Sequence, residues 1–193
     1  MSGGIDSSVS ALLMKQAGHD VIGVFMRHGS HVKSPPDTGS NRRRKQGCCS
    51  LEDSHDARRV ADQLGIPFYV LNFESDFHKV VTYFVEEYDR GATPNPCIVC
   101  NRDLKFGRLF EYAAAVGAEK IATGHYANVQ HVNGSSLLKK GKDSLKDQAY
   151  VLWGIPKETL SRTILPLGNL TKKEVRNIAR DHLLETAETP ESM

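Results

Sequence analysis

Two stretches of the sequence carry residue types and spacings suited to chemistry, and the first is Ser2–Ser8 (SGGIDSS). Gly3 and Gly4 let a backbone approach an anion closely, and three serine hydroxyls offer donors. A helical apolar pattern follows, so the positive end of a helix dipole faces the same anion. The Lys-Ser/Thr ending of a Walker A loop is absent. The stretch predicts a phosphate-binding loop of another kind, in which Asp6 helps to hold Mg²⁺ indirectly; the alternative is an ordinary serine-capped turn.

The second stretch is TPNPCIVCN, which places Cys97 and Cys100 three residues apart beside a helix start. One helical turn puts both sulfurs on the same side, and the helix dipole favours a thiolate there. Three interpretations are open: half of a zinc site without a second Cys/His pair, a redox pair, and a sulfur-handling nucleophile. The remaining cysteines, Cys48 and Cys49, are most simply small buried residues.

Composition narrows the class of protein. The chain has 193 residues, of which 39% are hydrophobic and 25% charged, with a net charge of +2, as in a globular protein. No apolar run approaches the roughly 20 residues of a membrane span, and no secretory leader is recognisable, so we expect a cytoplasmic protein without a membrane partner. Basic residues gather in two runs, which are either solvated loops or nucleic-acid contacts: 42–45, and Lys139, Lys140, Lys142 and Lys146.

The elements that must position these residues alternate between helical periods and short β-rich runs. Helices are expected after Ser8, from Ser50 to Leu64, from a Ser75 cap to Tyr88, from the cysteine pair to Gly117, and after a Thr171–Glu174 capping box. Strands are expected at 21–26, 68–73 and 120–123, with a hairpin around Asn133-Gly134 and a long loop at 27–47. The alternation predicts an α/β fold with a doubly wound, mostly parallel sheet.

The position of the phosphate loop bears on the sheet. In a doubly wound sheet the strand before the first such loop is central, and here only Met1 precedes it. We therefore expect the first strand to be missing, which leaves 21–26 and 120–123 facing an empty slot. Residues 1–140 are expected to form a catalytic domain. Residues 141–193 are expected to continue the same domain.

The opening loop is similar to the SGGxDS loop of the N-type ATP pyrophosphatases, which cleave ATP between its α- and β-phosphates. Seven stretches occur in order along nearly the whole chain: SGGIDSS, GCCSLEDSHDARRVADQLGIPFYVLNF, TPNPCIVCNRDLKFG, ATGHYA, KDQAYVLWG, PLGNLTKKEVR and ESM. Together they resemble the tRNA-specific 2-thiouridylase family. The resemblance implies the ATP pyrophosphatase (adenine nucleotide alpha hydrolase-like) fold. It also implies ATP-dependent replacement of the 2-oxygen of a wobble uridine in tRNA by sulfur.

The resemblance also implies site residues. Cys100 matches the catalytic cysteine, which forms a disulfide with a second cysteine during sulfur delivery, with Cys97 and Asp6 as further catalytic candidates. The ATP site comprises Ser2, Gly3, Gly4, Ile5, Asp6, Ser7, Ser8, Met26 and Gly124. The tRNA positions comprise Asn95, Pro96 and Cys97 at the target base, His125, Lys146, Asp147 and Gln148. Two of these have simpler interpretations, His125 as a hydrogen-bonded strand-end residue and Lys146 as a surface lysine.

Two departures from the family pattern matter. Some members have Asp where Cys97 stands, so a form with both cysteines is a candidate for an iron–sulfur cluster on Cys97 and Cys100. The family's persulfide-bearing cysteine lies beyond an ESM-like segment, where this sequence stops, and its C-terminal RNA-binding β domains are likewise absent. Alternatives are thus an ATP- or tRNA-binding fragment without complete thiolation, or another tRNA-modifying ATP pyrophosphatase. A sulfur-donating protein is an expected partner.

Overall fold

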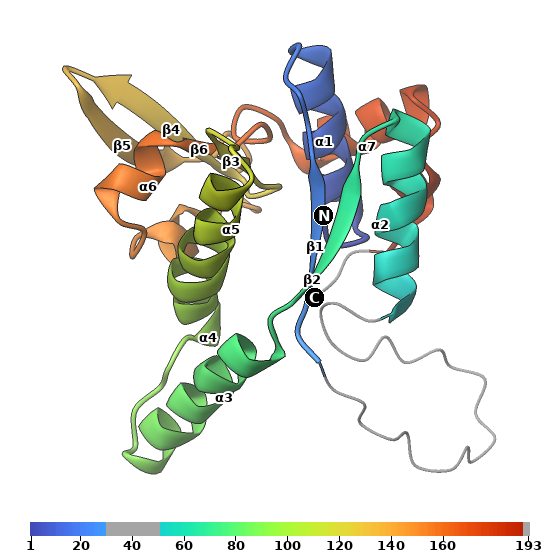
Figure 1. Cartoon of the computed structure of the whole chain (residues 1–193). Coiled ribbons are helices and arrows are strands. Elements are labelled where there is room, and N and C mark those ends of the chain that lie inside the picture. Colours follow the sequence, from blue (N-terminus) through green and yellow to red (C-terminus); the bar gives the residue numbers. More distant parts are fainter. Residues whose placement is uncertain (30–50, 191–193) are drawn as a thin grey trace.

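The computed structural model describes residues 1–29 and 51–190. Its first part contains helix α1 (Ile5–Gln16), strand β1 (Gly23–Arg27), helix α2 (Leu51–Leu64), strand β2 (Phe68–Asn72) and helix α3 (Glu74–Asp89) (Figure 1). A long helical run follows, made of α4 (Pro96–Val99), the π-helix η1 (Cys100–Arg108) and α5 (Leu109–Ala115). The expected Ser50 start of α2, the expected long loop beyond residue 29, the basic run at 42–45 and the Cys48–Cys49 pair lie outside the described residues.

The second part is built of shorter elements. Strand β3 (Ile121–Ala122) leads to the hairpin β4 (Ala127–Val132) and β5 (Ser135–Lys140), followed by η2 (Ala149–Leu152) and α6 (Lys157–Ser161). Strand β6 (Thr163–Ile164), helix α7 (Lys172–Asp181) and η3 (Glu185–Glu188) complete it. No helix among residues 1–29 and 51–190 is long and apolar enough to cross a membrane.

The strands pair in three separate couples. β1 and β2 are parallel, with Gly23 opposite Phe68, and β3 and β6 are also parallel. The antiparallel hairpin β4–β5 turns at Asn133 and Gly134, whose φ angles of 48° and 75° lie in the left-handed region that such tight turns require. The parallel strands and the Asn-Gly hairpin confirm the sequence expectations.

The two parallel couples are not joined to each other in the described structure. β1 pairs with β2 on one side, and β3 pairs with β6. On the remaining side of β1, the amino group of Met1 donates a hydrogen bond to the carbonyl oxygen of Val24. The described strands therefore form two separate parallel pairs and no continuous sheet through both.

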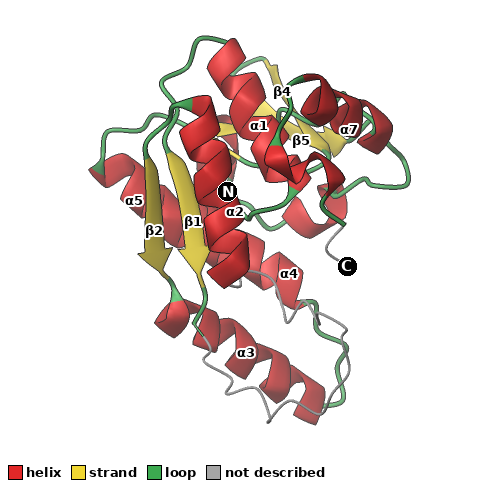
Figure 2. Cartoon of the chain, turned by 90° about the vertical axis from the view of Figure 1, so that its right-hand side faces the viewer, coloured by secondary structure: helices red, strands yellow, loops and turns green. Residues whose placement is uncertain are grey.

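Helices α1, α2 and α7 enclose the largest core. The predicted stripe of α2 is confirmed, because Ala57, Val60 and Ala61 are fully buried and Leu64 nearly so. Figure 2 shows α2 beside β1 and β2, with α3 extending below the two strands. The capping box of α7 is also confirmed, since the Thr171 hydroxyl accepts from the Glu174 backbone N–H and the Glu174 carboxylate accepts from the Thr171 N–H.

The expectations for α3 were partly wrong. The helix begins at Glu74, one residue before the predicted Ser75 cap. The backbone N–H of Glu74 donates to Asn72 Oδ1 at 3.0 Å. Of the predicted apolar stripe only Val80 is buried, whereas Val81, Phe84 and Tyr88 are exposed. The period was read correctly, but a helical period does not tell whether a neighbour covers the face.

The segment from Pro96 to Ala115 also differs from the expected single α-helix. Nine residues, Cys100–Arg108, form a π-helix between two α-helical pieces. A π-helix is rare and frequently found at functional sites, and the apolar period of the sequence does not distinguish it from an α-helix. Strand β6 was not predicted either, because its two residues are too short to show a period of their own.

Candidate active site

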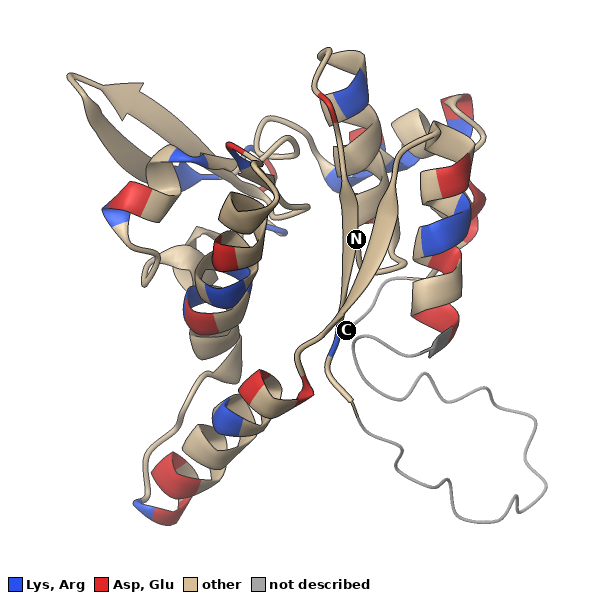
Figure 3. Cartoon of the chain, viewed as in Figure 1, with Lys and Arg blue, Asp and Glu red and all other residues tan. Residues whose placement is uncertain are grey.

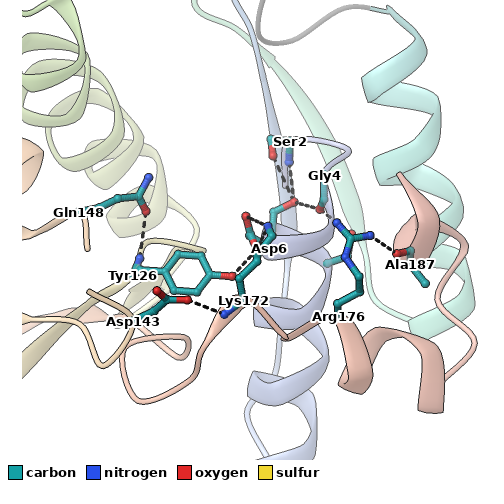
Figure 4. Close-up of polar contacts among 11 residues, drawn as sticks. Ser2, Gly4, Asp6, Tyr126, Asp143, Gln148, Lys172, Arg176 and Ala187 are labelled. Atoms are coloured by element: carbon teal, nitrogen blue, oxygen red, sulfur yellow. Dashed lines mark hydrogen bonds and ion pairs between the residues drawn. The ribbon is translucent and has the colours of Figure 1, made fainter. Parts of the chain in front are cut away.

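Ser2–Ser8 form a closed turn at the N-terminus of α1 (Figure 4). The Ser7 hydroxyl accepts from the Ser2 backbone N–H at 3.0 Å and donates to the Gly4 carbonyl oxygen at 2.9 Å. Ser8 is fully buried and donates to the same carbonyl at 3.0 Å. Gly4 is the N-cap of α1 and no side chain caps the helix, so backbone N–H groups of its first turn are available to an anion.

Two glycines bring neighbouring elements against this loop. Gly3 has φ +75°, and a Cβ there would lie 2.4 Å from the Asp53 carbonyl oxygen in α2. A Cβ on Gly124, just after β3, would lie 2.8 Å from the Asp6 carbonyl carbon and 3.0 Å from the Ser7 nitrogen. Only glycine permits both approaches, so the predicted nucleotide residues Ser2–Ser8 and Gly124 lie together.

The carboxylate of Asp6 is the centre of a polar cluster that links α1 to α7 (Figure 4). Lys172 Nζ donates to the two carboxylate oxygens at 2.7 and 2.8 Å, and the Tyr126 hydroxyl donates to Oδ1 at 2.7 Å. Lys172 is held in turn at its backbone, where its N–H donates to Asp143 Oδ2 at 2.8 Å. A lysine at the mouth of a phosphate loop can meet a phosphate in place of this carboxylate.

Sequence reasoning did not single out Lys172 or Tyr126 as site residues. Both lie within stretches that carried the family resemblance, PLGNLTKKEVR and ATGHYA. The signal that could have found Lys172 is its place in the first turn of a capped helix, directly after the Thr171 N-cap. Its pairing with Asp6, 166 residues away, required the tertiary structure.

The stretch Lys146–Gln148, predicted to contact tRNA, is largely engaged within the chain. Gln148 Oε1 accepts from the Tyr126 N–H at 3.0 Å, and the Gln148 N–H donates to the Tyr126 carbonyl at 2.8 Å. Asp147 Oδ1 accepts from the Gly141 N–H at 2.8 Å. These bonds hold Asp147 and Gln148 against Gly141 and Tyr126. Lys146 is half-buried, and its backbone N–H donates to the Asp143 carbonyl at 3.1 Å.

His125 lies in the interior, with 8% of its surface exposed. Its Nδ1 is 2.8 Å from the Thr123 hydroxyl, and its ring centroid is 6.2 Å from that of Phe106. Burial, followed by the positive charge of Lys105, lowers the pKa of His125 to about 3. This position agrees with the simpler interpretation, a hydrogen-bonded histidine at the end of a strand.

The depressed pKa of His125 gives a prediction about stability. The folded state binds the His125 proton only near pH 3, whereas the unfolded chain binds it near pH 6.5. Protonation therefore favours unfolding, and stability is lost as pH falls from 6.5 towards 3, by at most about 1.4 kcal/mol per pH unit. We expect a His125→Asn variant, which can keep the Thr123 bond, to lose less unfolding free energy between pH 7 and pH 4.5, measured by urea denaturation. Equal losses in the two proteins would contradict this.

The cysteine pair lies on the helical run that starts at Asn95. Asn95 Oδ1 accepts from the Cys97 N–H at 3.0 Å and caps α4, which places Cys97 in the first turn with Pro96 before it. Cys97 is exposed, whereas Cys100 is half-buried and packs against the cluster that contains Met26. The tertiary structure thus brings Cys100 and Met26, the predicted adenine contact, into one apolar cluster.

The side chains around Asp6 and the cysteine pair bear on the two predicted metal sites. Both oxygens of Asp6 accept from Lys172, whose positive charge disfavours a Mg²⁺ bound directly to Asp6 in this arrangement. Iron–sulfur clusters take about four cysteine thiolates, and Cys97 and Cys100 supply two. No group of three or more Cys, His, Asp or Glu within the described ranges is arranged to hold a metal. The described residues alone therefore do not fit a cluster.

The family now follows from comparison of the whole chain with known proteins. Residues 1–193 match the family described as tRNA methyl transferase HUP domain. The chain belongs to this family.

Two curated relatives of this family member carry the same name. A "tRNA-specific 2-thiouridylase MnmA" of Rhodopirellula baltica is 50% identical over 200 residues, covering 93% of this chain and 50% of the relative. A protein of the same name from Geotalea uraniireducens is 49% identical, covering 100% of this chain and 51% of the relative. The chain spans about half the length of the curated relatives it matches. The family resemblance stated from the sequence is thereby confirmed.

Solved structures agree on the fold of this family member. An NMN synthetase from Francisella tularensis matches with a TM-score of 0.57 and 17% identity, covering 99% of this chain and 63% of that chain. An NH3-dependent NAD synthetase from Campylobacter jejuni matches with a TM-score of 0.53 and 19% identity, covering 95% and 62%. At these identities the likeness concerns the fold alone, and it confirms the α/β fold of the ATP pyrophosphatase type.

Proposed function

We propose that this chain is the ATP-using catalytic part of an enzyme that replaces the 2-oxygen of a tRNA uridine by sulfur. The observation that carries the proposal is that residues distant in sequence meet at the loop and at the cysteine pair. A loop at the start of α1, a helix without a side-chain cap, adjoins Gly124, and Cys100 shares an apolar cluster with Met26. The family relationship supplies the direction of the chemistry. We also propose a cytoplasmic location and a sulfur-donating protein as partner.

Activation comes first in the proposed mechanism. The loop Ser2–Ser8 holds the β- and γ-phosphates of ATP against the N-terminus of α1, where the helix dipole and backbone N–H groups favour negative charge. The uridine 2-oxygen attacks the α-phosphorus, and pyrophosphate leaves into the loop. Lys172 can exchange its bond with Asp6 for one with the departing pyrophosphate, which stabilises developing charge.

Sulfur transfer follows. The carbonyl oxygen, now part of a phosphate ester, leaves as AMP when a sulfur nucleophile attacks the base carbon. Cys100 assists from its half-buried position, because a thiolate near a helix start is a good nucleophile and forms a disulfide when persulfide sulfur is delivered. The target base must be turned out of its stack to reach Cys100. Asn95, Pro96 and Cys97 surround that position in the proposal.

The proposal is tested by pyrophosphate release from ATP with and without an unmodified tRNA that carries uridine at the wobble position. We expect release to depend on tRNA, and Asp6→Asn, which removes the charge facing Lys172 at nearly constant volume, to slow it by about 10- to 100-fold. A tRNA with cytidine at the wobble position is the matched control.

Three other results would overturn the proposal or part of it. Release that requires a free carboxylate and ammonia would indicate an amidating enzyme. Release with the cytidine tRNA at the same rate would exclude uridine as the acceptor. Binding of ATP and tRNA without any pyrophosphate would identify a binding protein.

One lysine of the second basic run is already paired with a carboxylate of the chain. Of the second basic run, Lys142 forms an ion pair with Glu174 at 2.8 Å. Figure 3 shows both signs of charge side by side on α2 and along α3. Recognition of tRNA is therefore expected to depend on specific contacts as well as on a basic surface.

A further inference from the structure

Two large aromatic side chains stand out on the surface around η2. Tyr150, within η2, is 64% exposed, and Trp153, directly after it, is 68% exposed. Exposing large rings in this way forgoes the free energy that burial would give. Within the described parts of the chain, neither ring has an aromatic neighbour or a stacked cation, whereas Phe84 and Tyr88 on α3 lie 5.8 Å from each other.

The backbone beneath these rings is firmly held. Leu152, between them, is 1% exposed, and Ile155, two residues after Trp153, is 8% exposed. Both belong to a hydrophobic cluster that also contains Phe106 of the π-helix. Asn101 Nδ2 donates to the Val151 carbonyl oxygen at 3.1 Å, which ties η2 to the π-helix. The rings thus project from a fixed turn, so the backbone that carries them does not need to be ordered when a partner binds.

The same turn adjoins the cysteine pair. Asn95 Nδ2 donates to the Tyr150 hydroxyl at 3.2 Å, while Asn95 Oδ1 accepts from the Cys97 N–H. One amide side chain therefore links the Tyr150 ring to the first turn of α4. A Cβ on Gly154 would lie 3.6 Å from Arg102 and 3.8 Å from Ile98, so the end of η2 packs along the helix that carries Cys100.

We propose that Tyr150 and Trp153 form a stacking surface for unpaired bases of tRNA next to the base held at Cys100; the inference rests on the proposed function. Unpaired bases have apolar faces that stack on Tyr and Trp rings largely independently of sequence. A base turned out towards Cys100 leaves its neighbours unstacked, and these rings replace the lost stacking. Lys157, exposed at the start of α6, makes no ion pair with any described residue and can meet a phosphate nearby.

Trp153 is the single tryptophan of the chain, so its fluorescence reports on the surface directly. We expect an anticodon stem-loop RNA with uridine at the wobble position to quench this fluorescence on binding. Tyr150→Ala and Trp153→Ala should each weaken binding about 5- to 150-fold, the range for one stacked base. Tyr150→Phe, which keeps the ring and loses the Asn95 contact, should stay within about threefold. Tyr88→Ala, at 65% exposure on α3, is the matched control.

Abasic RNA separates stacking from other contacts. An RNA that lacks the base next to the wobble uridine should bind the unaltered chain as weakly as intact RNA binds Tyr150→Ala or Trp153→Ala. At least one of these two substitutions should then not weaken binding of the abasic RNA any further. If all variants bind intact RNA equally well and Trp153 fluorescence is not quenched, the stacking surface is overturned. The proposed function is kept in that case if pyrophosphate release still depends on tRNA. If the unaltered chain neither binds the RNA nor releases pyrophosphate in a tRNA-dependent way, both the stacking surface and the proposed function are overturned.

Discussion

Cys100→Ser is expected to reduce formation of 2-thiouridine at least about 1,000-fold, while tRNA-dependent release of pyrophosphate stays within about threefold of the unaltered chain. A serine hydroxyl is nearly the same size as a thiol but neither ionises near neutral pH nor forms a disulfide. The half-buried place of Cys100 beside the Met26 cluster is therefore kept. Nucleoside analysis by mass spectrometry, with a persulfide donor supplied, measures sulfur, and a coupled assay measures pyrophosphate.

Cys97→Ser is the matched control for this result. Cys97 is exposed in the first turn of α4, and serine keeps the backbone bond to Asn95. We expect its loss of thiolation to be at least ten times smaller than that of Cys100→Ser. Equal losses would contradict the assignment of Cys100 alone and point to a function of the pair, for which iron and sulfide analysis after anaerobic purification is the next measurement.

Gly124→Ala is expected to reduce tRNA-dependent pyrophosphate release at least about 100-fold. The added methyl group would lie 2.8 Å from the Asp6 carbonyl carbon and 3.0 Å from the Ser7 nitrogen. Both atoms are backbone in the first turn of α1, so they cannot turn aside as a side chain can. The phosphate loop must move away from β3 by a substantial fraction of an ångström, and its donors no longer meet the phosphates.

Gly154→Ala controls for the substitution itself, because its Cβ would have only ordinary contacts of 3.6 Å and more. We expect it to retain pyrophosphate release within about threefold. Urea denaturation at pH 7 shows whether Gly124→Ala remains folded, since overpacking costs about 1–3 kcal/mol. A folded Gly124→Ala chain with unchanged pyrophosphate release would contradict the place of Gly124 in the nucleotide site.

Local patterns in the sequence were sufficient for the elements with a strong period or a specific turn. The buried stripe of α2, the Asn133-Gly134 hairpin and the Thr171 capping box are each specified by neighbours within a few residues. The glycines and serines of the opening stretch predicted a phosphate loop at a helix start, although a serine-capped turn was the alternative. Motif order supplied the family and its candidate residues.

Only the tertiary structure decided which of these residues meet. The Asp6–Lys172 ion pair joins positions 166 residues apart, and the Asn95–Tyr150 contact joins positions 55 apart. The exposed face of α3 and the burial of His125 were likewise undetermined, because a period specifies a face but not what covers it. The physical reason is common to these cases: residue type and spacing act through the local backbone, whereas burial and pairing depend on how distant segments pack.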